Sequence, residues 1–401
     1  MGRKAHVVHR GEIGDMMSLE AKDAQVQGTV SPGYEGVRAA FEDNLASGRD
    51  IGAAFAVYRD GAPVVDLWGG SHVDDRSMKI TDRSLFGVNS TTKGVAAICI
   101  AMLVDRGKLD YATPVSTYWP AFAANGKAAI TVGEVMSHQA GLVGAREPVT
   151  LDDYIAHDGV AALLAAQMPF FRPGLWGYHA LTIGTLADEL VRRTDGRTIA
   201  QFYHEEIASR IDVDIFLGLP AGEDDRYVAM FGLEDVAIFD FEVPNAEAMA
   251  AALTNPMIAW DFPNHRYWRA AGHSSAAGTA SARGLAKLYG HLVSENQPDG
   301  TRLLSQATLA QATRERIAGP DQCSGFDDRY AAGFRLNVRT MGPNPTSFVH
   351  PGFGGSVAFA DPAHRVGIAY VTNTMRNPDA QWVDPRVAAL LAAFYAAESA
   401  C

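Results

Sequence analysis

The sequence predicts an α/β protein of the α+β type: one antiparallel sheet flanked by N- and C-terminal helices, with a large, mostly helical inserted domain. Strand-like apolar runs occur near residues 51–68 and again within 333–372, and short turns separate the runs in each group. Strands joined by short turns pair antiparallel. The long stretch between the groups shows helical periodicity broken by Gly and Pro. The predicted parts are an arm at 1–27, an α/β domain formed by 28–93 and 331–401, and the inserted domain at 94–330.

The N-terminal part of the chain predicts a helix followed by a hairpin. The arm is polar and lacks periodicity, but apolar residues then recur at helical spacing at Val37, Ala40, Phe41 and Leu45. Two apolar runs follow, on either side of an Arg-Asp-Gly turn. Because Asp-Gly between apolar runs is a strong hairpin signal, the sequence predicts paired strands over 51–58 and 62–68.

The rest of the chain predicts helices first and strands later. An apolar helix should run from Ser90 to Arg106 and end at Gly107, and the clearest later helices are 180–193 and 198–211. Strand character returns in four short segments, and a helix with one apolar face closes the chain. These elements are the strands 333–339, 347–350, 356–360 and 365–372, and the helix 385–398.

Composition and charge exclude several classes of function. The net charge is −12 and the basic residues are scattered singly, so no basic patch indicates nucleic-acid binding. No run approaches the ~18 apolar residues of a membrane helix. The N-terminal residues lack the pattern of a secretory signal, and three distant cysteines (Cys99, Cys323 and Cys401) form neither a disulfide framework nor a metal spacing. We therefore expect a cytoplasmic protein.

Ser90 and Lys93 form a candidate nucleophile and base. A serine hydroxyl reacts poorly until another group takes its proton. The Ser-Thr-Thr-Lys segment spaces the two residues i to i+3, so on a helix both side chains share one face. At a helix N-terminus, free N–H groups favour developing negative charge. An apolar run follows Lys93, and a buried amine acts as a base or lowers the pKa of a second base.

Three further segments follow in order along the chain. Residues 135–142 are Val-Met-Ser-His-Gln-Ala-Gly-Leu, residues 173–180 are Pro-Gly-Leu-Trp-Gly-Tyr-His-Ala, and residues 350–356 are His-Pro-Gly-Phe-Gly-Gly-Ser. Together with Ser-Thr-Thr-Lys, they resemble the superfamily of penicillin-binding proteins and class C β-lactamases, and within it the family VIII carboxylesterases. The resemblance runs from about Gly28 to the C-terminus and implies a β-lactamase/transpeptidase-like fold.

The resemblance implies a role for each segment. Tyr178 falls at the position of the family's catalytic tyrosine, and a lysine ammonium beside it should lower the pKa of its phenol. His350 and Gly352 lie on the strand that lines the site, and Gly352 suits close approach of the backbone to a ligand. One oxyanion donor would be the N–H of Ser90, and the other the N–H of Phe353 or of a residue one position either way. Trp176 should face that strand across a substrate cleft.

Two departures from the family pattern bear on the substrate. His350 replaces the lysine, and Ala180 replaces the asparagine, that help hold the carboxylate and amide of a β-lactam in related enzymes. Both replacements are usual in the esterase branch. They favour neutral esters over β-lactams.

The resulting hypothesis is a serine carboxylesterase that hydrolyses short-chain esters through an acyl-enzyme on Ser90. Because Ser90, Lys93 and Tyr178 supply nucleophile, base and acid, we expect neither a metal nor an organic cofactor. The partner would be a small-molecule ester, without nucleic acid or membrane; the oligomeric state stays open. Alternatives are an acyltransferase using the same acyl-enzyme, a weak β-lactamase or peptidase, and a non-catalytic scaffold that retains the fold.

Overall fold

The structure is a computed structural model that describes residues 25–232, 243–257, 259–295, 300–337, 341–376 and 384–400. Its main element is a nine-stranded sheet within these residues, in the order β1-β3-β2-β14-β13-β12-β11-β10-β9. Every neighbouring pair is antiparallel, as predicted. The strands are β1 (Val26–Val30), β2 (Gly52–Arg59), β3 (Ala62–Gly70), β9 (Ile317–Pro320), β10 (Asp327–Tyr330), β11 (Arg335–Leu336), β12 (Phe348–Pro351), β13 (Val357–Asp361) and β14 (Val366–Thr372).

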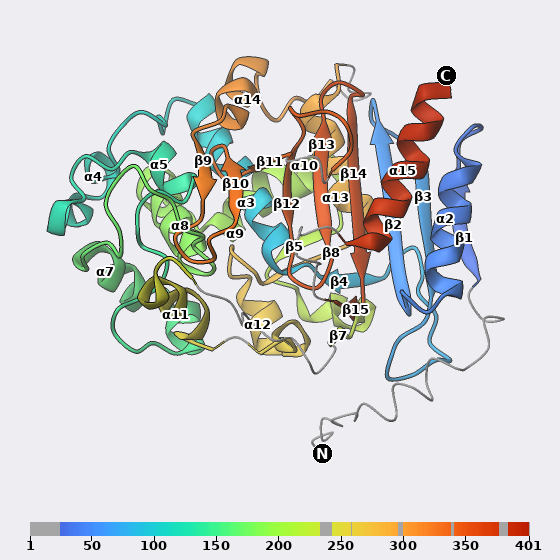
Figure 1. The fold of residues 1–401 in the computed structure, drawn as a ribbon, viewed down its shortest axis with the longest axis horizontal. Coiled ribbons are helices and arrows are strands. Elements are labelled where there is room, and N and C mark those ends of the chain that lie inside the picture. The colour runs from blue at the N-terminus through green and yellow to red at the C-terminus, as the bar shows by residue number, and fades with distance from the viewer. Residues whose placement is uncertain are drawn as a thin grey trace.

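Helices cover both faces of this sheet. Among the described residues the first and last helices, α2 (Glu35–Ala46) and α15 (Pro385–Ala400), pack together against one face. Helix α13 (Ala282–Val293) contacts β2, β13 and β14 from the other side. Successive residues of a strand point to opposite faces, so β14, buried along its whole length, is mostly apolar, and the hydroxyls of Tyr370 and Thr372 at its end bond to Asp50. In Figure 1 the end of the sheet that α2 and α15 cover lies to the right, and the end with β9 and β10 lies beside the helical part to the left.

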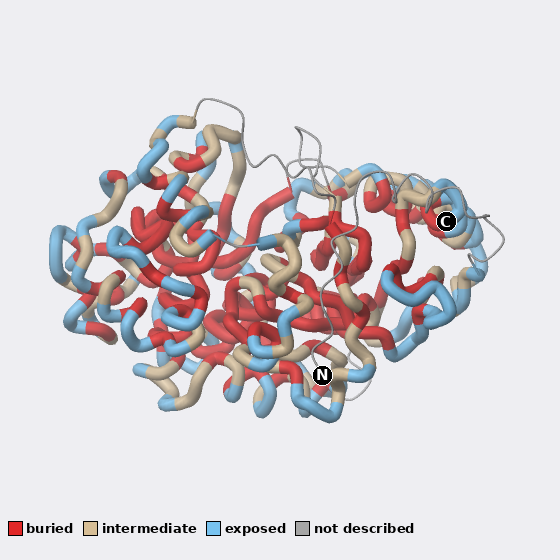
Figure 2. Tube along the Cα trace, turned by 90° about the horizontal axis from the view of Figure 1, so that it is seen from below, coloured by how far each residue is buried: buried red, intermediate tan, exposed pale blue. Residues whose placement is uncertain are grey.

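The helical part is built around α3 (Thr92–Asp105), which is buried from Thr92 to Leu103. Helices α8 (Thr182–Asp195) and α9 (Ile199–Tyr203) pack against it, and Figure 2 shows this interior as buried. The 3₁₀ turn Asn89–Thr91 leads into α3, and the π-helical turn His204–Ala208 continues α9 into α10. The other helices are α4 (Val115–Tyr118), α5 (Val132–Met136), α6 (Leu151–Ala156), α7 (Asp158–Ala166), α10 (Ser209–Ile211), α11 (Ala246–Thr254), α12 (Arg266–Ala271) and α14 (Gln306–Thr313).

Two small sheets connect the parts of the chain. One has four strands in the order β5-β8-β4-β6, and in the other β15 pairs with β7 in parallel. The four-stranded sheet brings β4, which leads into the turn carrying Ser90, next to β8. These strands are β4 (Leu85–Gly87), β5 (Ile215–Leu217), β6 (Tyr227–Val228), β7 (Phe231–Gly232), β8 (Gly278–Ala280) and β15 (Thr374–Met375).

Most of the predicted elements are confirmed, and three details are corrected. Strand β1 begins inside the predicted arm; the strand is short and has Gly28 at its centre, which hid it in the sequence. The late strand predicted over 333–339 covers only Arg335–Leu336, and residues 338 and 339 lie outside the described residues. Within 94–330, α13 packs on the large sheet, and β9 and β10 belong to it. Periodicity gives the type of an element but not the sheet that it joins. The domain boundaries themselves stay predictions.

Candidate active site

Ser90 lies just before α3, at the point where the chain turns into the helix. The preceding Asn89 has a left-handed backbone with φ of 44°, a conformation that Asn tolerates better than most residues. Ser90 itself is only partly buried. The nucleophile predicted from the sequence is therefore reachable by a substrate while its backbone is fixed by the start of a buried helix.

Lys93 lies in the first turn of α3, as the i to i+3 spacing predicted. Its Nζ is 2.9 Å from Ser90 Oγ and 2.9 Å from the carbonyl oxygen of Ser275. Ser275 is held in turn by α8, because its hydroxyl accepts from the N–H of Gly184 and donates to the Leu181 carbonyl. The amine thus bridges the serine and a fixed backbone acceptor.

The surroundings of Lys93 favour its neutral form. The side chain is 3% exposed, and among the described residues no carboxylate pairs with it. Burial therefore holds the pKa of Lys93 well below the usual range of a lysine. Four buried histidines in this region have lowered pKa values, because of burial and because the charged lysine would repel them: His138, His179 (about 4), His273 (about 3) and His350 (about 3).

Tyr178 lies beside this pair, as predicted, but its charge state differs from the prediction. Its ring centroid is 5.0 Å from Lys93 Nζ, and its backbone N–H donates to Asp321 Oδ1. Burial raises the pKa of Tyr178 above its ordinary value, although a hydrogen bond with Ser90 lowers it in part. The prediction of a lowered pKa was wrong because the same burial that disfavours a phenolate also keeps the lysine uncharged.

The turn after β12 approaches Ser90 closely. A Cβ at Gly352 would collide with the hydroxyl of Ser356 and the carbonyl of Val88, so only glycine fits there. The carbonyl of Phe353 accepts a hydrogen bond of 2.8 Å from Asn89 Nδ2. Within the described residues, neither the Phe353 N–H nor the Ser90 N–H donates to another group of the protein. Both N–H groups are therefore free to bind a ligand, and their role as oxyanion donors stays a prediction.

Of the three side chains predicted to line the site, only that of Phe353 is exposed to solvent. The Phe353 side chain is 39% exposed, whereas His350 and Trp176 are buried. Trp176 Nε1 already donates to the Gly319 carbonyl at 3.0 Å, and its ring packs 5.1 Å from that of Tyr330. Trp176 thus forms part of the packed wall, and its contact with substrate stays a prediction. His350 Nδ1 bonds to the Pro351 carbonyl at 3.0 Å, which leaves Nε2 buried without a partner.

Sequence reasoning missed Asn89 and Ser275. The signal for Asn89 was its position directly before the nucleophile, where a residue that tolerates positive φ is needed. Ser275 touches Lys93 through a backbone carbonyl, so its side chain gave no signal. Among the residues placed by the structure, no group of three or more His, Cys, Asp or Glu side chains could hold a metal ion.

A family model described as Beta-lactamase matches residues 37–393. The chain belongs to the beta-lactamase family. This confirms the resemblance and the fold class predicted from the sequence. The chain is 34% identical to the "Esterase/beta-lactamase LipL" of Mycobacterium tuberculosis (strain ATCC 25618 / H37Rv), over 88% of this chain and 84% of that protein.

Solved structures of the family superpose closely on the chain. A family VIII carboxylesterase is 39% identical, with a TM-score of 0.87 over 93% of this chain and 100% of the other. A penicillin-binding protein homolog from Caulobacter crescentus is 38% identical, with a TM-score of 0.85 and the same coverage. EstA from Arthrobacter nitroguajacolicus Rue61a is 32% identical, with a TM-score of 0.85 over 94% and 99% of the two chains.

We expect Lys93→Met to abolish activity while stabilising the fold relative to wild type at acidic and neutral pH. Because the pKa of Lys93 is lower in the folded than in the unfolded protein, the unfolded chain binds more protons between those two pKa values. The contribution of Lys93 to stability therefore rises with pH, and the advantage of Lys93→Met should shrink as pH rises. Melting temperatures of both proteins from pH 6 to 9 test this. A difference that grows with pH contradicts the burial of an uncharged amine.

Proposed function

We propose that the chain is a serine carboxylesterase that hydrolyses short-chain carboxylic esters through an acyl-enzyme on Ser90. The observation that carries this proposal is the 2.9 Å contact between Lys93 Nζ and Ser90 Oγ in a buried site. An uncharged amine at this distance is positioned to take the hydroxyl proton. The relatives whose names include esterase and carboxylesterase support the ester as the substrate class.

The charge states favour Lys93 as the group that takes the proton from Ser90. Oγ then attacks the ester carbonyl, and the N–H groups of Ser90 and Phe353 bind the oxyanion that forms. Tyr178, a neutral phenol beside Ser90 and Lys93, donates its proton to the leaving alkoxide as the tetrahedral intermediate collapses, and Lys93 returns the proton to Tyr178. Water then releases the acid from Ser90 by the reverse sequence. The net reaction consumes one ester and one water and yields one acid and one alcohol.

His350 supports a preference for neutral esters. Its pKa is lowered to about 3, chiefly by burial, so its ring is uncharged at neutral pH. A β-lactam carries a carboxylate, and the ring offers it no positive charge. Ala180, in the loop that also carries Tyr178, offers no amide. An acyltransferase stays the alternative, because the same acyl-enzyme would react with an alcohol in place of water.

The partner that we propose is a small-molecule ester, without nucleic acid. In the part of the chain placed by the structure, no helix has the length and apolar content to cross a membrane. Cys99 and Cys323 are buried free thiols, which is compatible with the proposed cytoplasmic location. Cys401 lies outside the described residues.

We expect Ser90→Ala to abolish hydrolysis of p-nitrophenyl butyrate and covalent labelling by a fluorophosphonate, because both need the Ser90 hydroxyl. Intact-mass spectrometry and steady-state rates measure the two effects. Ser209→Ala, which removes an exposed hydroxyl on α10, is the matched control and should behave as wild type. Labelling that persists in Ser90→Ala would show that another residue is the nucleophile.

Lys93 and Tyr178 should behave as one catalytic unit. Tyr178→Phe and Lys93→Ala should each lower kcat by on the order of 10² to 10⁴, and the double variant should lose little more. Lys93→Arg should also fail, because a guanidinium is not deprotonated at neutral pH. In wild type, kcat/KM should fall as pH drops through the lowered pKa of the pair, since protonation removes the base. If the loss of kcat in the double variant equals the product of the two single losses, Lys93 and Tyr178 act independently and this prediction is wrong.

β-Lactams should be poor substrates. A polar anchor missing from a closed site costs up to about 10⁴-fold in discrimination. We therefore expect the kcat/KM for nitrocefin to lie orders of magnitude below that for p-nitrophenyl butyrate, measured on one enzyme preparation. Comparable values for the two substrates would refute the argument from His350 and Ala180.

A further inference from the structure

The glycine-rich turn at residues 352–355 is held in place through its carbonyl groups. The Phe353 carbonyl accepts from Asn89 Nδ2 at 2.8 Å. The next carbonyl, that of Gly354, accepts from the Arg376 N–H and from Arg386 Nη2, each at 3.2 Å. The N–H of Phe353 belongs to the peptide group directly before these two carbonyls in the same turn, so the groups that hold the carbonyls also limit how that N–H can rotate.

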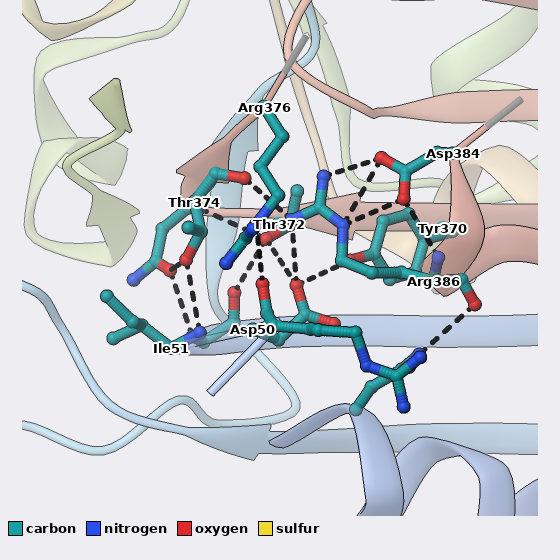
Figure 3. Close-up of polar contacts among 12 residues, drawn as sticks. Asp50, Ile51, Tyr370, Thr372, Thr374, Arg376, Asp384 and Arg386 are labelled. Carbon is teal, nitrogen blue, oxygen red and sulfur yellow. Dashed lines mark hydrogen bonds and ion pairs between the residues drawn. The ribbon is translucent and has the colours of Figure 1, made fainter. Parts of the chain in front are cut away.

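Arg386 reaches the turn from the first turn of α15, at the far end of the chain. Its side chain is fully buried and its guanidinium lies between Asp50 and Asp384, as Figure 3 shows. Nε and Nη2 form a fork on the Asp384 carboxylate, at 2.9 and 2.6 Å. Nη1 donates to Asp50 Oδ1 at 3.0 Å and to the Thr374 carbonyl at 2.7 Å. With the Gly354 bond, all five N–H donors of the guanidinium are engaged.

Two features indicate that Arg386 orders the turn and does not only attach α15 to the sheet. Apolar side chains of α15, among them Leu390 and Phe394, already pack in the core cluster of this sheet face. Buried ion pairs are often replaceable by apolar residues without loss of stability, but an apolar residue could not donate to the Gly354 carbonyl. Moreover, a Cβ at Gly355 would collide with Arg386 Nη2, and Gly355 has a φ of 118°, so the turn is shaped around the guanidinium.

We propose that Arg386 is a positioning residue for the oxyanion hole, which it sets through the carbonyl of Gly354. This role rests on the proposed esterase function. The two carboxylates hold the guanidinium in one orientation, and the guanidinium holds the Gly354–Gly355 peptide group, one residue beyond Phe353. A displaced turn would still admit substrate but would aim the Phe353 N–H away from the developing oxyanion. Loss of Arg386 should therefore lower kcat much more than it changes KM.

The test compares Arg386→Lys with Glu398→Gln, both on α15. Lysine keeps the charge but has three donors and no fork, so it cannot hold Asp50, Asp384 and Gly354 together. Glu398 anchors the other end of α15 through Arg59 Nη2 at 2.6 Å, far along the helix from the turn. We measure kcat and KM for p-nitrophenyl butyrate, melting temperature, and the infrared frequency of the carbonyl in a furylacryloyl acyl-enzyme, which reports hydrogen bonds to that oxygen.

Removal of one oxyanion donor costs about 10²- to 10³-fold in kcat, so a misaligned donor should cost about 10- to 100-fold. We expect Arg386→Lys to show this loss with KM within about threefold of wild type and a raised carbonyl frequency. Glu398→Gln should lower the melting temperature while kcat and the frequency stay at wild-type values. Should Arg386→Lys fail to fold, Asp384→Asn, which weakens the fork but leaves the guanidinium in place, should show the same pattern in smaller measure.

The proposal is overturned by a folded Arg386 or Asp384 variant with wild-type kcat and carbonyl frequency. It is also overturned if Glu398→Gln loses as much kcat as the Arg386 variant, because the effect would then follow general loosening of α15. A wild type no more active than Ser90→Ala would refute the esterase function itself, and the positioning role with it. An active wild type beside unaffected Arg386 variants refutes only the positioning role.

Discussion

The proposed role of Lys93 as the base for Ser90 depends on keeping its amine uncharged in the protein interior. Burial without a carboxylate partner achieves this, at a cost in stability that only a well-packed surrounding can offset. The packing of α3 explains how: the helix is buried from Thr92 to Leu103, so Lys93 in its first turn is shielded from solvent. The Ser275 carbonyl gives the amine one acceptor without giving it a counter-charge. A carboxylate in that place would have fixed the lysine as an ammonium and removed the base.

The site is assembled from segments that lie far apart in the sequence. The proposed nucleophile and base come from the start of α3, the phenol from the loop before α8, and the proposed second oxyanion donor from the turn after β12. Gly352 allows the turn after β12 to lie close to Ser90, since any side chain at this position would collide with Val88 and Ser356. That turn is also held by Arg386 of α15, which in turn bonds to Asp50, so segments from both ends of the chain contribute to one site. The antiparallel sheet formed by both chain ends is therefore a requirement of the site and not only its support.

Much of this could be predicted from the sequence where the signal is local. The Asp-Gly hairpin, the helix after Ser90 and the i to i+3 pairing of Ser90 with Lys93 each follow from spacing alone, and the structure places them as expected. The misses share a different cause, since they depend on what packs around a residue. Strand β1 exists because β3 offers an edge, the pKa of Tyr178 rises because its surroundings exclude water, and Arg386 gains its role from a carbonyl more than thirty residues away. None of these partners is marked in the local sequence.

The raised pKa of Tyr178 and the lowered pKa of Lys93 have the same cause, which is burial. Desolvation disfavours every charged form, so the resting pair is a neutral amine and a neutral phenol. In the proposed mechanism, charge then appears only as the reaction proceeds, when the amine gains a proton and the oxyanion forms. The groups that stabilise this charge must already be oriented, because a buried site has little solvent that could reorient around the new charge. The turn at Phe353 is held by directional hydrogen bonds from Asn89, Arg376 and Arg386. Since the resting site is neutral, the developing charge is stabilised mainly by hydrogen-bond donors, and these donors must already have the correct geometry.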